Sequence, residues 1–174
     1  MTVESTLIIG GCRSGKSRYA LGLAAEIEKE PKIFVATCIP RDKEMQKRVD
    51  DHQKERGQTW QTIEAPLNVP EVLATEAAKA GVILIDCLTL WVSNLLMKSE
   101  DLELIKQKGH QLVAAIQNSA GPVILVTNEV GLGIVPDNRL ARLFRDAAGA
   151  INQTIAAACK RVVMTVAGIP VTLK

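Results

Sequence analysis

The sequence predicts an α/β fold of three α/β/α layers, built on a mainly parallel sheet with a short antiparallel C-terminal edge strand. Apolar runs of strand length alternate with helix-like stretches, which is typical of β-α-β units. The runs are apolar at consecutive positions, as expected for strands covered by helices on both faces. A turn containing glycine and proline then reverses the chain. The runs are Leu7–Ile9, Ile33–Thr37, Val82–Asp86, Val123–Asn128 and Val162–Val166, and the edge strand is Val171–Leu173 after Gly168–Pro170.

Length and composition limit the classes of protein to which the chain can belong. The chain has 174 residues of which 47% are hydrophobic, so we expect a single domain over residues 1–174 with a substantial core. A net charge of +2 with 23% charged residues does not indicate a nucleic-acid or membrane partner. The sequence shows no signal-peptide pattern and no apolar run of about 18–20 residues. We therefore expect a cytoplasmic protein without a membrane span.

The first apolar run is followed by a phosphate-binding loop of the pattern G-x-x-x-x-G-K-[ST]. Its glycines let backbone N–H groups face phosphate oxygens, its lysine reaches the β and γ oxygens, and its serine can bind Mg²⁺. A helix predicted over Arg18–Glu30 would place the phosphates at a helix N-terminus. The alternative is a chance glycine-rich turn, but the order strand, loop, helix favours a P-loop NTPase-type fold. The loop is Gly10, Gly11, Cys12, Arg13, Ser14, Gly15, Lys16 and Ser17.

A helix predicted from Asp42 to Arg56 follows the second run and the breaker Pro40. Its apolar stripe consists of Met45, Val49, His52 and Arg56. Arg48 and Arg56 each lie four positions from His52, which disfavours the protonated imidazole and leaves a neutral ring nitrogen available as a nucleophile. The alternative is a structural histidine.

The third run contains the second specific pattern. Trp60–Glu64 is predicted as a short extended segment, and a helix is predicted over Pro70–Lys79. The run Val82–Asp86 then ends in an acid, as the Walker B strand of phosphate-loop proteins does. Asp86 can complete an Mg²⁺ shell with Ser17, whereas the alternative is an aspartate that caps a turn.

Helices are predicted over Thr89–Lys98, over Leu102–Ser119 with His110 on its surface, and from Asn138 onward. The segment Val130–Pro136 is predicted to be a flexible apolar loop. Residues after Asn128 break the N-K-x-D pattern of regulatory GTPases, so that class is not indicated. The last helix carries Arg139, Arg142 and Arg145, which either bind a substrate phosphate, contact a neighbouring subunit or form a solvated basic face.

The four cysteines show no metal-type spacing with the two histidines. Reduced thiols are expected. Cys12, Cys38 and Cys87 follow strand-like runs and should gather at one edge of the sheet, either as small apolar filler or as a metal or redox cluster.

Several of these motifs together resemble one family, that of bifunctional adenosylcobinamide kinase/adenosylcobinamide-phosphate guanylyltransferases of cobalamin biosynthesis. The resemblance covers nearly the whole chain, and its most specific parts are the His52 helix and the Asn128–Pro136 block. The matching segments are Gly10–Ala20, Glu44–Met45, Arg48–Val49 with His52, Trp60, Glu64, Asp86–Trp91, Thr127–Pro136 and Asn138–Asp146.

The resemblance implies two reactions. ATP or GTP phosphorylates adenosylcobinamide, and GTP then donates GMP to adenosylcobinamide phosphate through a covalent histidine–GMP intermediate at the position of His52. It also implies a homotrimer, Mg²⁺ with the nucleotide, and catalysis by His52 and Lys16. The implied nucleotide contacts outside the phosphate loop are Ala36, Thr37, Cys38, Gln53, Lys54, Glu55, Arg56, Glu64 and Asp86.

The chain departs from this family pattern at two positions. Lys43 stands where many members have an acid, and Asp51 where some have a second histidine, which leaves His52 as the local candidate. A P-loop small-molecule kinase without guanylyltransferase activity and a nucleotide-binding regulatory module remain the alternative functions.

Overall fold

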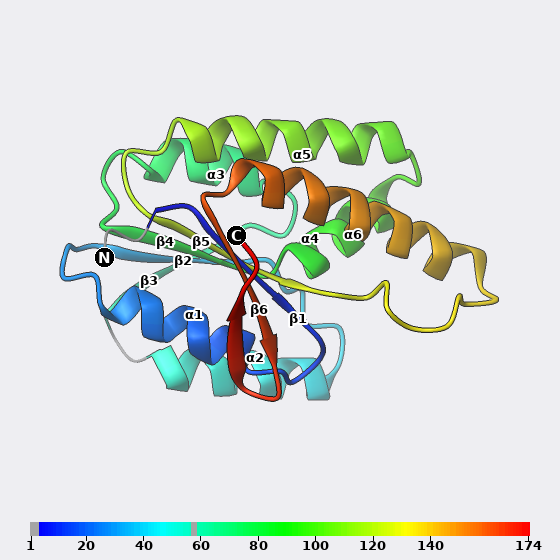
Figure 1. Ribbon diagram of the computed structural model, residues 1–174, viewed down its shortest axis with the longest axis horizontal. Helices are drawn as coiled ribbons and strands as arrows, with labels where there is room; N and C mark the ends of the chain where they lie inside the picture. The colour runs from blue at the N-terminus through cyan, green and yellow to red at the C-terminus, as the bar shows by residue number, and fades with distance from the viewer. Residues whose placement is uncertain (1–3, 57–58) are drawn as a thin grey trace.

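The computed structural model describes residues 4–56 and 59–174, whose strands form a seven-stranded sheet (Figure 1). The strand order is β3-β2-β4-β5-β1-β6-β7, parallel throughout except between β6 and β7. The strands are β1 (Thr6–Gly10), β2 (Lys32–Ala36), β3 (Trp60–Glu64), β4 (Val82–Asp86), β5 (Val123–Asn128), β6 (Arg161–Val166) and β7 (Ile169–Thr172). The helices are α1 (Lys16–Ala25), α2 (Lys43–Arg56), α3 (Val69–Glu76), α4 (Leu88–Lys98), α5 (Leu102–Gln117) and α6 (Arg139–Ala158).

Helices lie on both faces of the sheet (Figure 1), with α3 to α6 on one face and α1 and α2 on the other. Successive strand residues point to opposite faces, so Leu7 packs with the α3–α6 cluster and Ile8 with the α1 cluster. The predicted three-layer fold, mainly parallel sheet and antiparallel edge strand are thus confirmed.

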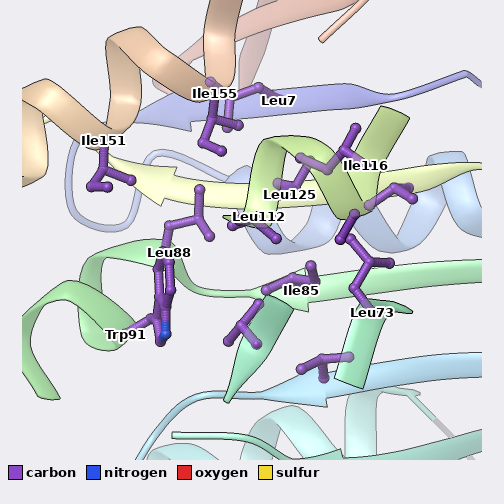
Figure 2. Close-up of a cluster of buried hydrophobic side chains, with 14 of the residues drawn as sticks. Leu7, Leu73, Ile85, Leu88, Trp91, Leu112, Ile116, Leu125, Ile151 and Ile155 are labelled. Carbon is purple, nitrogen blue, oxygen red and sulfur yellow. The ribbon is translucent and has the colours of Figure 1, made fainter. Parts of the chain in front are cut away.

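The larger core lies between the sheet and α3–α6 (Figure 2). Trp91 is fully buried there, and its indole N–H donates to the Leu67 carbonyl at 3.0 Å. Helices α5 and α6 approach closely at Gly109, where a Cβ would lie 2.5 Å from Cδ1 of Ile151. A larger residue at this helix crossing would therefore have to displace the end of the Ile151 side chain.

Several predicted boundaries were wrong: the helix predicted to end at Lys79 ends at Glu76, and the one predicted to end at Ser119 ends at Gln117. Two further differences have a physical reason. Helix α1 ends at Ala25, not at Glu30; Glu30 precedes Pro31, which disfavours helical geometry in the residue before it. Strand β7 begins at Ile169, two residues earlier than predicted, because the reversal is made by Ala167 and Gly168. Both have positive φ, 52° and 83°, as a two-residue hairpin turn of type I′ requires.

The free edge of β7 is interrupted by Pro170, which pairs with Thr165. The Leu173 N–H donates to the Val162 carbonyl, and hydrogen-bonded pairs alternate along an antiparallel ladder. Pro170 thus occupies a non-hydrogen-bonded pair, and the edge lacks a donor at its position. A proline placed this way hinders pairing with a further strand.

Over residues 4–56 and 59–174, no helix combines the length and apolar character needed to cross a bilayer.

Candidate active site

The phosphate loop connects the end of β1 to the start of α1. Gly15, the residue before α1, has φ 95°, and the helix has no side-chain cap at its N-terminus. First-turn N–H groups of such a helix can bind an anion. The Ser14 N–H donates to the Gly11 carbonyl at 3.3 Å, and Nζ of Lys16 donates to the same carbonyl at 2.6 Å. The loop has the strand, turn and helix geometry that its sequence predicts.

Lys16 is buried, with 8% of its surface exposed, and it is the one charged side chain buried in the described part of the chain. Burial lowers its pKa, while the nearby Asp86 carboxylate opposes that shift. A buried ammonium that donates a hydrogen bond to a loop carbonyl is suited to neutralise phosphate oxygens.

Asp86 ends β4 beside the first turn of α1. The Ser17 hydroxyl donates to Oδ2 of Asp86 at 2.8 Å. This pair of oxygen ligands fits Mg²⁺, which prefers hard oxygen donors and takes its remaining ligands from water and phosphate. No group of three or more His, Cys, Asp or Glu side chains among the described residues is placed to hold a metal by itself.

Thr37 fixes the backbone that follows Asp86. Its fully buried hydroxyl accepts a hydrogen bond from the Cys87 N–H at 2.8 Å and donates to the Cys87 carbonyl at 2.7 Å. The Thr37 carbonyl in turn accepts from the Asn94 side-chain amide at 2.8 Å. The two hydrogen bonds of the Thr37 hydroxyl therefore join the segment after β2 to the backbone of Cys87, the residue next to Asp86.

Helix α2 places Arg56, its last residue, against β2. The Arg56 guanidinium carbon lies 3.6 Å from the centroid of the Phe34 ring, which is a cation–π contact. Burial lowers the pKa of Arg56, and attraction to Asp86 opposes the shift. Met45, Val49 and Arg56 are half-buried whereas the other described side chains of α2 are exposed, so the predicted stripe is confirmed for those three.

His52 lies in α2 by its backbone. Its side chain, like those of Arg48 and Glu55, is outside the described residues, so the argument about the charge of the imidazole stays a prediction. The side chains of Gln53 and Lys54 are exposed.

The sheet register gathers further predicted residues. Ala36 pairs with Glu64 on one side and with Asp86 on the other, and Gly10 pairs with Asn128. Thr37 and Cys38 follow directly after β2. Residues from five strands therefore meet at the carboxyl edge of the sheet, where open α/β sheets bind their ligands.

Comparison with known proteins adds the family. Residues 6–173 match the family model described as cobinamide kinase / cobinamide phosphate guanyltransferase. The chain belongs to this family. It is 43% identical to the bifunctional adenosylcobalamin biosynthesis protein CobP of Pseudomonas aeruginosa, over 97% of this chain and 96% of that protein. It is 39% identical to the proteins named CobU of Escherichia coli and Salmonella typhimurium, over 97% of this chain and 98% of each.

In this family member a buried polar network, which sequence reasoning missed, supports the end of β5. The Thr127 hydroxyl donates to Oδ1 of Asn152 at 2.8 Å, and the Asn152 amide donates to the Asn128 carbonyl. The Thr89 hydroxyl accepts from the Asn128 N–H at 2.7 Å. Asn152 lies among Ala148, Ile151 and Ile155 on the buried face of α6. A polar residue within that apolar stripe is the signal that sequence reasoning had available.

Two of the three arginines on α6 hold the loop after β5. Arg145 donates to the carbonyls of Gly131 and Ile134, and Arg142 donates to those of Pro136 and Asp137. Arg139 instead pairs with Glu100 on the surface. Arg142 and Arg145 therefore have a structural partner that the three interpretations drawn from the sequence did not include.

The cysteines that follow β1, β2 and β4 lie at the predicted edge. Cys12 is exposed, Cys38 is half-buried, and Cys87 is buried. Burial raises the pKa of Cys38, and it raises the pKa of Cys87 to about 12. These two thiols are therefore protonated at neutral pH. His110 is exposed on α5, as predicted.

Proposed function

We propose that this chain, as a single domain over residues 1–174, catalyses two successive transfers on adenosylcobinamide. A nucleoside triphosphate first phosphorylates its aminopropanol hydroxyl, and GTP then donates GMP to the new phosphate, which gives adenosylcobinamide-GDP and pyrophosphate. Family membership supports both reactions. The observation that carries the proposal is the phosphate loop, in which Lys16 is buried and Ser17 is hydrogen-bonded to Asp86. These residues would form the triphosphate site.

In the kinase step the loop amides and the N-terminus of α1 bind the phosphates, and Lys16 neutralises charge on the transferred group. The substrate hydroxyl attacks the γ-phosphorus while the bond to the β-phosphate oxygen breaks. Ser17 and Asp86 are the residues that would hold Mg²⁺, which when bound neutralises phosphate charge.

In the guanylyl step His52 is the proposed nucleophile. A neutral imidazole nitrogen attacks the α-phosphorus of GTP, the bond to the β-phosphate oxygen breaks, and pyrophosphate leaves with the electron pair. A phosphate oxygen of adenosylcobinamide phosphate then attacks the same phosphorus, and the bond to nitrogen breaks. Arg56, one helical turn after His52, contacts Phe34 and is attracted to Asp86, which supports an approach of this end of α2 to the nucleotide.

The remaining predicted contacts belong to the same proposal. Ala36–Cys38, Gln53–Arg56 and Glu64 would contact the nucleotide. The proposal includes a cytoplasmic location and the homotrimer that the resemblance implies. Sedimentation of the purified protein would test the trimer.

The test is covalent labelling with GTP that carries the label on its α-phosphate. We expect a protein-bound label that is labile in acid and stable in base, as a phosphorus–nitrogen bond is. His52→Ala should lose the label while keeping nucleotide binding. The matched control is His110→Ala, since His110 is the other histidine of the chain and is exposed on α5.

Full labelling of His52→Ala would contradict the nucleophile. A wild-type protein that transfers γ-phosphate to adenosylcobinamide but takes up no α-label would instead be a small-molecule kinase without guanylyltransferase activity.

A further inference from the structure

We propose that the β6–β7 hairpin positions the phosphate loop, with Thr165 and Gly168 as positioning residues that act through Ser14. The Ser14 and Thr165 hydroxyls are 2.8 Å apart and form a buried hydrogen bond between residues 151 positions apart in sequence. The Gly168 N–H donates to the Ser14 carbonyl at 3.0 Å. Both the side chain and the backbone of Ser14 are thus held by the hairpin.

Two glycines of the loop motif allow the hairpin to approach. A Cβ on Gly10 would lie 2.5 Å from the Thr165 carbonyl oxygen, and one on Gly15 would lie 3.1 Å from Cα of Gly168. Real Cβ atoms do not tolerate the first distance, and the second requires the hairpin to shift. These glycines therefore serve the packing of the loop on the hairpin, in addition to the turn geometry for which the motif is known.

The hairpin reaches the loop because β6 is longer than the paired part of β1. The β1–β6 register ends with Gly10 opposite Thr165, where β1 gives way to the loop. Beyond that pair, β6 continues to Val166 and turns at Ala167 and Gly168. The turn therefore runs beside the loop and presents the Gly168 N–H to Ser14.

Ser14 is the position at which such an anchor has most effect. Its neighbours Arg13 and Gly15 have φ values of 55° and 95°. Positive φ is unfavourable for arginine and persists when the surroundings fix it. By holding Ser14 at two atoms, the hairpin fixes the loop conformation before the nucleotide arrives. A site arranged in advance loses less free energy to ordering on binding.

The test compares Thr165→Val, Thr165→Ser and the matched control Thr6→Val. Thr6 and Thr165 lie at opposite ends of the β1–β6 pair, each with 1% of its surface exposed, and the Thr6 hydroxyl donates to the Glu4 carbonyl. Calorimetry would measure the Kd for GTP with Mg²⁺ well below each Tm. Thr165→Val should weaken binding about 5- to 10-fold, the loss of one buried hydrogen bond. Thr165→Ser and Thr6→Val should remain within about twofold of wild type.

Hydrogen exchange of the nucleotide-free protein gives a second measurement. Peptides covering residues 10–17 should exchange faster in Thr165→Val and not in Thr6→Val, because opening of the loop exposes its amides. This measurement does not depend on the proposed function. If the protein failed to catalyse either reaction, the proposed function would be contradicted, but the proposed role of the hairpin would not be affected.

A double mutant completes the test. If the two hydroxyls act as a pair, Ser14→Ala with Thr165→Val should lose no more affinity than the worse single variant. The proposal is overturned by additive losses, by wild-type affinity and exchange in Thr165→Val, or by an equal effect of Thr6→Val.

Discussion

Lys16 combines burial with a positive charge, and a bound phosphate resolves the conflict. The nucleotide-free protein has to desolvate the ammonium, which is why the pKa of Lys16 lies below its ordinary value of 10.5. Phosphate oxygens would restore the interactions that the ammonium has lost. Lys16 thus lowers the stability of the nucleotide-free protein and stabilises the complex with phosphate, as is common for functional charges.

Because burial of this charge is unfavourable in the free protein, we predict that Lys16→Met weakens GTP binding without lowering the stability of the nucleotide-free protein. GTP affinity should fall about 10- to 100-fold, because a charge-assisted contact is removed. The Tm of the nucleotide-free protein should not fall, because the buried charge is removed as well. Lys106→Met, which alters an exposed lysine paired with Glu103, should change neither. Calorimetry and thermal unfolding measure the two effects, and a marked loss of Tm in Lys16→Met would contradict the account.

The same variant should alter the pH dependence of stability. Since the folded protein lowers the pKa of Lys16, the unfolded chain binds more protons between that lowered pKa and 10.5, and stability rises with pH in this window. The penalty is fully present below the window. Denaturant unfolding at several alkaline pH values should show that Lys16→Met lacks this rise.

At the scale of elements, the β6–β7 turn is built from a residue poorly suited to it. Ala167 has φ 52°, where alanine is unfavourable by roughly 1–2 kcal/mol and asparagine is better tolerated. Ala167→Asn should therefore raise the free energy of unfolding by about 0.5–1 kcal/mol. The control is Ala157→Asn, at an exposed helical position of α6. There the same change should instead lower the free energy of unfolding by roughly a few tenths of a kcal/mol. Urea denaturation of both variants would measure this, and equal signs would contradict it.

Sequence patterns predicted the elements better than their ends. The buried runs of β1, β2, β4, β5 and β6 are apolar at consecutive positions, which makes them visible without a structure. The turn was predicted at Gly168–Pro170 but lies at Ala167 and Gly168. Its position was misjudged because alanine is not a typical turn residue, whereas Pro170, which lies inside β7, is. Local residue preferences are misleading here, because pairing with β6 determines both the turn conformation of Ala167 and the extended conformation of Pro170.

The candidate site, too, could be predicted from the sequence only in part. Its phosphate loop and Asp86 were predictable, because their chemistry requires fixed residue types at fixed spacing. Thr165 and Asn152 were not, because their roles depend on partners 151 and 25 residues away. Contacts of that separation follow from the strand order, which the sequence alone did not provide.

At the scale of the whole molecule, the phosphate loop joins parts that are distant in the chain. It continues β1, which lies between β5 and β6 in the sheet; it contacts the β6–β7 hairpin through Ser14, and Asp86 of β4 through Ser17. A ligand bound there is held by several elements at once. We therefore expect nucleotide binding to stabilise the entire fold and not the loop alone.

This expectation can be measured as a shift in Tm. A ligand that binds the folded state at about 100 times its Kd adds roughly 2.7 kcal/mol, which corresponds to about 5–10 °C for a chain of this size. GTP with Mg²⁺ should produce such a shift. Guanosine, which lacks the phosphates that the loop binds, should produce little, and Lys16→Met should shift far less than wild type at the same GTP concentration. An equal shift with guanosine would place the binding energy in the base instead of the triphosphate, and would contradict the phosphate loop as the main source of affinity.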